Sequence, residues 1–150
     1  MKRAVFVDTD VVLDLLSRRD PFYPHAARLF SQAERGTIKA CVSSLSFANL
    51  FYILRKETSG SRAIGILKLF REVVTVLPVD DAVVSNALNA GFADFEDAVQ
   101  YHVALAARIP VLVTRNARHY RKSVITVCSA EEYLALQGRG KDVRRSLSAQ

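Results

Sequence analysis

Short runs of apolar and β-branched residues alternate along the chain with stretches in which apolar residues recur at helical spacing. The apolar runs occupy residues 4–7, 40–43, 73–79, 111–114 and 124–128. Spacings of three and four between apolar residues predict helices within residues 26–33, 45–53, 64–70 and 98–106. Strands that are apolar on both faces and alternate with helices are typical of a parallel sheet covered on both sides. We therefore predict an α/β fold with three α/β/α layers around a central parallel sheet of about five strands.

The predicted domain covers residues 1–136, and residues 137–150 form a tail. The tail contains glycine and several lysine and arginine residues but few large apolar ones. Such a segment cannot bury enough apolar surface to fold alone, so we expect it to be mobile.

The beginning of the chain resembles a signal peptide, with two basic residues before an apolar run. Asp8 and Asp10 interrupt that run at once, so we interpret it as a strand. No apolar run approaches the roughly 20 residues that a membrane span requires. We therefore expect a cytoplasmic protein without a membrane partner.

The net charge of +6 and the pI of about 9.6 favour a polyanionic partner. Nucleic acid is the commonest such partner, although many basic proteins do not bind it.

Polar segments follow three of the predicted strands. Asp8 and Asp10 follow the first strand, a segment over 43–49 follows the second, and a segment over 114–116 follows the fourth. The acidic segment 94–97 opens the helix before that fourth strand. Sites in open α/β sheets form beyond the carboxyl ends of the strands, so we expect these segments to meet at one edge.

Carboxylates gathered at such an edge repel one another, and a divalent cation relieves that repulsion. Mg²⁺ and Mn²⁺ prefer oxygen ligands, and Mg²⁺ often binds only one or two carboxylates. A structural interpretation stays open, in which Asp8 or Asp10 caps the helix beginning near Val11 and Asp94 caps the helix that carries Asp97.

Other chemistries fit the sequence less well. The segment DTDVV over 8–12 matches the D-x-D-x-[TV] motif of haloacid-dehalogenase-type phosphatases, and residues 80–81 supply a later acidic pair. A suitably placed lysine is missing, however, and the chain is short for that class. No glycine-rich nucleotide loop and no H-E-x-x-H motif occurs, and we expect His25, His102 and His119 to be ordinary helix or loop surface.

Three segments, in this order, resemble the PIN-domain family, which includes the VapC-type toxin ribonucleases. They are VFVDTDVVLD over 5–14, VSSLSFANL over 42–50, and DFEDAVQ over 94–100 followed by VTRN over 113–116. The resemblance covers nearly the whole chain up to about residue 136, and it is specific through the order of the segments. It implies a metal-dependent endoribonuclease that uses Mg²⁺ or Mn²⁺.

The resemblance also assigns roles to individual residues. Asp8 and Asp97 match the central metal-binding acids, and Asp94 is a supporting acid of this branch. Asn49 stands where many relatives carry glutamate, and Asn116 where many carry aspartate. The residues that we expect to support the site or to orient water and substrate are Asp10, Asn49, Thr114 and Asn116.

Basic residues after the fourth strand are the candidates for binding the phosphates of the RNA backbone. They are Arg115, Arg118, Arg121 and Lys122. The resemblance further implies an antitoxin partner and a homodimer. Because two expected acids are asparagine, one alternative is a catalytically weakened PIN-like module that binds RNA or protein.

Overall fold

The computed structural model describes residues 2–120 and 123–138, in which strands alternate with helices. Residues 130–138 form the last helix of that part. The preceding elements are β1 (Arg3–Val7), α1 (Thr9–Leu16), α2 (Tyr23–Glu34), β2 (Ile38–Ser43), α3 (Ser44–Glu57), α4 (Gly60–Arg71), β3 (Thr75–Leu77), α5 (Asp81–Asn89), α6 (Phe95–Ala106), β4 (Val111–Val113), the 3₁₀ turn η1 (Ala117–Tyr120) and β5 (Thr126–Cys128).

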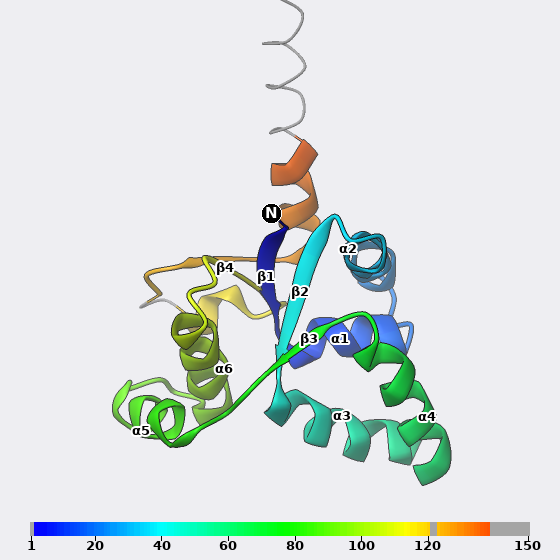
Figure 1. Cartoon of the computed structure of the whole chain (residues 1–150), viewed down its shortest axis with the longest axis horizontal. Coiled ribbons are helices and arrows are strands. Elements are labelled where there is room, and N and C mark those ends of the chain that lie inside the picture. Colours follow the sequence, from blue (N-terminus) through cyan, green and yellow to red (C-terminus); the bar gives the residue numbers. More distant parts are fainter. Residues whose placement is uncertain (1, 121–122, 139–150) are drawn as a thin grey trace, which may run out of the picture.

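The five strands form one parallel sheet in the order β3-β2-β1-β4-β5. From β1 the chain moves outward to β2 and β3, and it then returns to place β4 on the other side of β1 (Figure 1). The order therefore reverses between β1 and β4, where a crevice opens at the carboxyl ends of the strands. Asp8 directly follows β1, and Thr114 directly follows β4, so both residues lie at this point.

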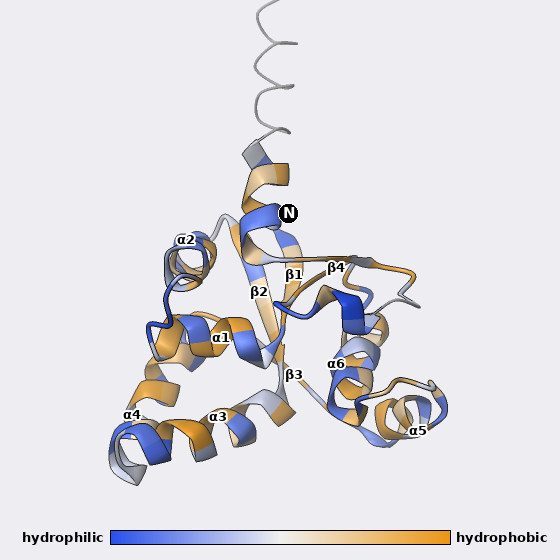
Figure 2. Ribbon diagram, turned by 180° about the vertical axis from the view of Figure 1, so that it is seen from behind, coloured by the Kyte–Doolittle hydropathy of each residue, from blue (hydrophilic) through white to orange (hydrophobic). Residues whose placement is uncertain are grey.

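Helices cover both faces of the sheet, which confirms the predicted three-layer α/β/α fold. Side chains alternate along β1, so that Val5 and Val7 pack in one core while Phe6 packs in the other. The first core includes buried residues of α1, α2, α3 and α4, and the second includes those of α5 and α6. Figure 2 shows the apolar strands at the centre, between helices that carry polar and apolar residues.

Side-chain caps fix the start of several helices around the crevice. Asp8 caps α1, Ser43 caps α3 and Asp94 caps α6, so the capping interpretation of Asp8 and Asp94 is confirmed. Asp80 caps α5, a helix that the spacing of apolar residues did not predict. Asp80 and Asp81 thus begin a helix, which gives this acidic pair a structural role.

The helix over 130–138 extends into the segment expected to be a tail, since residues 137 and 138 are helical. The rest of that segment, 139–150, lies outside the described residues. Within 2–120 and 123–138, none of the helices combines the length and apolar character needed to cross a membrane.

Candidate functional site

Asp8 is the most deeply placed acid of the crevice, with 6% of its surface exposed. Its Oδ1 accepts a hydrogen bond from the backbone N–H of Thr9 at 2.7 Å. Its Oδ2 accepts one from the Thr114 hydroxyl at 2.9 Å and lies 3.2 Å from the Tyr120 hydroxyl. Burial raises the pKa of Asp8 above its ordinary value, and these donors partly offset the effect.

Asp97, in the first turn of α6, faces the same Tyr120 hydroxyl from the other side. The hydroxyl lies 3.4 Å from Asp97 Oδ1, so it stands between the carboxylates of Asp97 and Asp8. Burial raises the pKa of Asp97, and repulsion from Asp8 and Asp94 raises it further. His119 Nδ1 lies 3.0 Å from Asp97 Oδ2, so this histidine belongs to the site and is not ordinary surface.

Asp10 forms a second acidic position, held from the loop after β4. Its Oδ2 accepts hydrogen bonds from the backbone N–H of Arg115 and from Asn116 Nδ2, both at 3.1 Å. The Thr114 hydroxyl is 3.4 Å from this oxygen and closer to Asp8. Burial and then repulsion from Asp8 raise the pKa of Asp10 to about 7. Asp10 Oδ1 is buried and has no hydrogen-bond partner among the described residues.

Glu96 is an acidic residue of the site to which the sequence analysis gave no role. Asn49 Nδ2 donates a hydrogen bond to Glu96 Oε1 at 2.9 Å. The Glu96 carboxylate therefore lies beside Asn49, the position at which many relatives carry glutamate. Burial raises the pKa of Glu96 first, followed by repulsion from Asp8 and Asp94. Only the fold could reveal this contact, because it joins α3 to α6 across 47 positions of sequence.

Gln100 is a buried residue beneath Asp8 and Thr9 to which the sequence patterns assigned no role. It is fully buried, and its Nε2 lies 2.9 Å from Ser46 Oγ, 3.1 Å from Thr9 Oγ1 and 3.5 Å from Asp8 Oδ1. It follows Asp97 by three positions, so both side chains share one face of α6. A polar residue three positions after Asp97, on the same face of the predicted helix, was the signal that could have identified it.

Three other predicted residues, Asp94, Arg115 and Arg118, are more exposed than Asp8. Asp94 Oδ1 accepts a hydrogen bond from the backbone N–H of Asp97 at 3.1 Å, as a cap does. Arg118 is exposed. Arg115 Nε instead lies 3.0 Å from the buried Asp14 Oδ2, so its side chain is paired within the fold. The last two predicted RNA contacts, Arg121 and Lys122, lie outside the described residues.

The donor set suits a hard divalent cation, although the side chains are not closed around one point. Among the residues that the structure describes, no three His, Cys, Asp or Glu side chains form a group that could hold a metal ion. Mg²⁺, however, commonly takes only one or two carboxylates and keeps several waters. Asp8 and Asp97 approach one hydroxyl from two sides. The pKa values of these acids are raised by burial and then by mutual repulsion, and a cation would relieve the repulsion.

Solved structures with a similar fold include VapBC and VapC proteins. DNA-bound VapBC from Salmonella typhimurium includes a chain with a TM-score of 0.67 at 20% identity, covering 87% of this chain and 99% of that one. A toxin–antitoxin complex from Klebsiella pneumoniae gives 0.63 at 17% identity, covering 84% and 97%. VapC20 from Mycobacterium tuberculosis, a sarcin–ricin loop cleaving toxin, gives 0.60 at 19% identity, covering 72% and 86%.

At these identities the structural likeness shows the fold alone. No curated protein matches the sequence. The family model described as PIN domain matches residues 4–118, which include Asp8, Asp97 and Asn116. The chain therefore belongs to the PIN-domain family.

Proposed function

We propose that this protein is a metal-dependent endoribonuclease that hydrolyses RNA phosphodiester bonds, and that it is the toxin of a toxin–antitoxin pair in the cytoplasm. One observation carries the proposal: the carboxylates of Asp8 and Asp97 approach a single hydroxyl from two sides of the crevice. PIN domains are typically nucleases, and the fold is similar to that of VapC20, a sarcin–ricin loop cleaving toxin.

In this proposal Asp8 and Asp97 hold Mg²⁺ or Mn²⁺, and Asp94 supports them from the start of α6. A bound ion of this kind supplies an activated water and stabilises charge on a phosphoryl oxygen. Thr114 fixes the orientation of Asp8 through its 2.9 Å hydrogen bond. Asn116 fixes Asp10, and the exposed Arg118 is free to contact an RNA phosphate.

The neutral residues at two expected acidic positions are offset by acids nearby. Asn49 contacts Glu96, and Asn116 contacts Asp10, so each asparagine is paired with a carboxylate. The negative charge of the site is therefore moved to neighbouring positions. This favours a catalytic site over the alternative of a weakened module that only binds RNA or protein.

A protein partner is supported by an apolar groove between α3 and α4. The groove has a volume of about 520 Å³ and is lined by Phe47, Phe51, Tyr52, Ile64 and Leu67 among others. Tyr52 and Ile64 are 58% and 46% exposed. Exposed apolar patches mark interaction surfaces, and similar folds occur in toxin–antitoxin complexes. We assign this groove to an antitoxin.

Cleavage of single-stranded RNA by rigorously purified protein tests the proposal. With Mn²⁺ present, wild type is expected to produce internal cuts, and Asp8→Asn to reduce the rate at least about 100-fold. Asp80→Asn is the matched control, because Asp80 also caps a helix but lies in α5. Unchanged cleavage by Asp8→Asn contradicts the proposal. RNA binding without any cleavage supports the binding module, and phosphate release from small esters supports a phosphatase.

A further inference from the structure

A pocket of about 220 Å³ adjoins the acidic site on the α2 side. Its lining includes Asp14 of α1, Phe22 and His25 at the start of α2, Asn116 after β4, and Glu131 of the last helix. Asn116 also donates its hydrogen bond to Asp10, so the pocket and the acidic site share one wall. The volume is below the roughly 300–1,000 Å³ of sites for drug-sized ligands, so it suits one small ring system.

Arg115 is the central polar group of this pocket, and it is held rigidly. Its Nε lies 3.0 Å from Asp14 Oδ2, and its guanidinium carbon lies 4.3 Å from the centre of the Phe22 ring. Its Nη1 and Nη2 groups have no hydrogen-bond partner among the described residues, and 31% of the side chain is exposed. A fixed guanidinium therefore presents N–H donors next to an aromatic ring that is 40% exposed.

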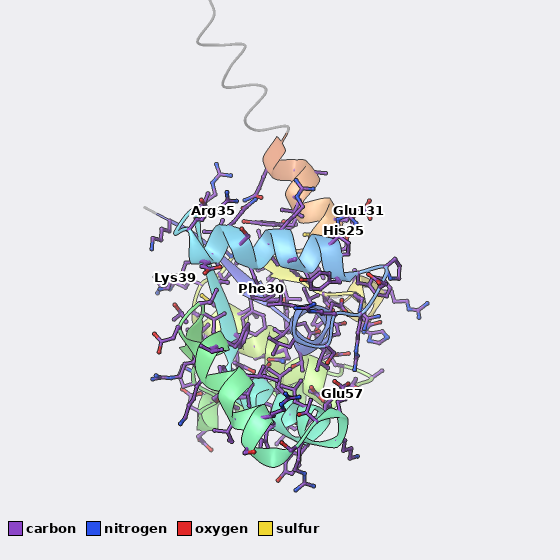
Figure 3. The ribbon with its side chains drawn as sticks, turned by 90° about the vertical axis from the view of Figure 1, so that its right-hand side faces the viewer. His25, Phe30, Arg35, Lys39, Glu57 and Glu131 are labelled. Atoms are coloured by element: carbon purple, nitrogen blue, oxygen red, sulfur yellow. The ribbon has the colours of Figure 1, made fainter. Side chains whose placement is uncertain are left out.

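The charge balance of the pocket argues against a phosphate as its ligand. Asp14 neutralises Arg115, and Glu131 adds a further negative charge on the opposite wall. His25 Nε2 lies 3.8 Å from Glu131 Oε2, and Figure 3 shows these two residues side by side near the start of α2. A pocket with this balance does not attract an anion. It suits a neutral, planar group that accepts hydrogen bonds.

We infer that this pocket binds one nucleobase of the RNA, with guanine preferred, next to the phosphate that is cleaved. Guanine offers two adjacent acceptors, O6 and N7, which match the paired donors of an arginine. Nucleobases in single-stranded RNA also stack on aromatic planes, which the Phe22 ring supplies beside Arg115. The inference rests on the proposed ribonuclease function. It gives Arg115 a role in base recognition in place of the expected backbone contact.

Nuclear magnetic resonance of the full chain without metal tests the pocket directly. The Nε–H signal of Arg115 can be assigned from its loss in Arg115→Lys. Titration with guanosine monophosphate is expected to shift this signal, with about tenfold tighter binding than cytidine monophosphate. Ribose 5-phosphate is expected to leave it unchanged. Equal binding of the two nucleotides, or binding of ribose 5-phosphate as tight as either, overturns the inference.

Two variants and a control locate the binding. Phe22→Leu keeps an apolar side chain but removes the aromatic plane, and Arg115→Lys keeps the charge but removes the paired donors. Both are expected to reduce affinity for guanosine monophosphate about tenfold. Arg62→Ala, on the exposed surface of α4, is expected to have no effect. Unchanged affinity in Phe22→Leu overturns the inference even if Arg115→Lys is unstable.

Cleavage mapping with Mn²⁺ separates this inference from the proposed function. If both hold, wild type cuts next to guanine, and Phe22→Leu cuts with reduced guanine preference. Metal-dependent cutting that is indifferent to the neighbouring base overturns the pocket assignment and leaves the ribonuclease standing. Guanine-specific binding with no cleavage overturns the ribonuclease and leaves the pocket standing.

Discussion

The Tyr120 hydroxyl oxygen lies 3.2 Å from Asp8 Oδ2 and 3.4 Å from Asp97 Oδ1. A phenol has one hydrogen, so it can donate to only one of these carboxylates at a time. The carboxylate that receives no hydrogen bond is still repelled by the other one. A divalent cation would satisfy both, and it would have to take the place of the hydroxyl as their shared partner. In the proposed function, Tyr120 and the metal ion would therefore compete for the same oxygens.

Replacing Tyr120 with phenylalanine is expected to shift this competition toward the metal. The metal-free variant loses a hydrogen bond to a buried charged group, so its free energy of unfolding is expected to fall by about 1–3 kcal/mol. The increase in melting temperature that Mn²⁺ causes is expected to be larger than in wild type, because no hydroxyl must be displaced. Differential scanning calorimetry with and without Mn²⁺ measures both quantities.

Tyr133→Phe provides the control for that experiment. Tyr133 is also buried, and its hydroxyl accepts a hydrogen bond from Gln137 Nε2, away from the acidic site. Tyr133→Phe is expected to change the melting temperature of the metal-free protein. The increase in melting temperature caused by Mn²⁺ is expected to be the same as in wild type. An increase in Tyr120→Phe no larger than in wild type would show that the hydroxyl and the metal do not compete.

Glu96 is expected to contribute to metal binding although it was absent from the sequence-based set of ligands. Glu96→Gln keeps an acceptor for the Asn49 amide but removes the negative charge near Asp8 and Asp97. Mn²⁺ affinity, measured by isothermal titration calorimetry, is expected to fall about tenfold. Glu72→Gln, on the exposed end of α4, is the matched control. Equal affinities for the two variants would remove Glu96 from the site.

The raised pKa of Asp10 predicts how the stability of the metal-free protein depends on pH. In the native state this carboxyl keeps its proton up to a pH of about 7, whereas its ordinary pKa is 3.8. The native state binds more protons between these values, so the free energy of unfolding falls as the pH rises from about 4 to about 7. Asp10→Asn removes the titration and keeps an acceptor for Asn116.

Urea unfolding at pH 5 and pH 8 in the presence of a chelator measures this effect. Wild type is expected to lose about 2–3 kcal/mol more than Asp10→Asn between the two pH values. An equal loss in both proteins would mean that Asp10 titrates at its ordinary pKa, and that burial and the charge of Asp8 do not perturb it.

The pairing of Arg115 with Asp14 is expected to stabilise the fold as well as the pocket. Only 2% of the Asp14 side chain is exposed, so Arg115→Ala leaves a buried carboxylate without its partner. The expected cost is about 3 kcal/mol, at the lower end for a buried pair because Arg115 is partly exposed. A double-mutant cycle with Asp14→Asn measures the coupling by chemical unfolding, and a coupling near zero would contradict this assignment.

The sequence was sufficient to predict the layers of the fold because its strands are apolar on both faces. Residues 4–7 and 40–43 fall within β1 and β2, and their alternating side chains divide between two cores. The helix α5 was missed because it is short and only Val83 and Ala87 are buried along it. Its start was marked by the cap at Asp80, which had been considered as part of a phosphatase motif.

The site was only partly predictable, for a different reason. Asp8 and the acidic segment 94–97 were marked by their places at the starts of predicted helices, and the resemblance to the PIN-domain family then singled out Asp8 and Asp97. The contacts of Glu96, Gln100 and Tyr120 depend on how α3, α6 and the loop after β4 approach one another. Tyr120 meets Asp8 across 112 positions, a distance at which periodicity and motif spacing carry no information.

A crystal soaked in Mn²⁺ and measured at an energy where manganese scatters anomalously tests the central claim most directly. We expect an anomalous peak coordinated by the carboxylates of Asp8 and Asp97, with the Tyr120 hydroxyl no longer bonded to both. The same soak of Asp97→Asn is expected to give a much weaker peak. A wild-type crystal with manganese bound elsewhere, and with Tyr120 still between the two carboxylates, would contradict the account.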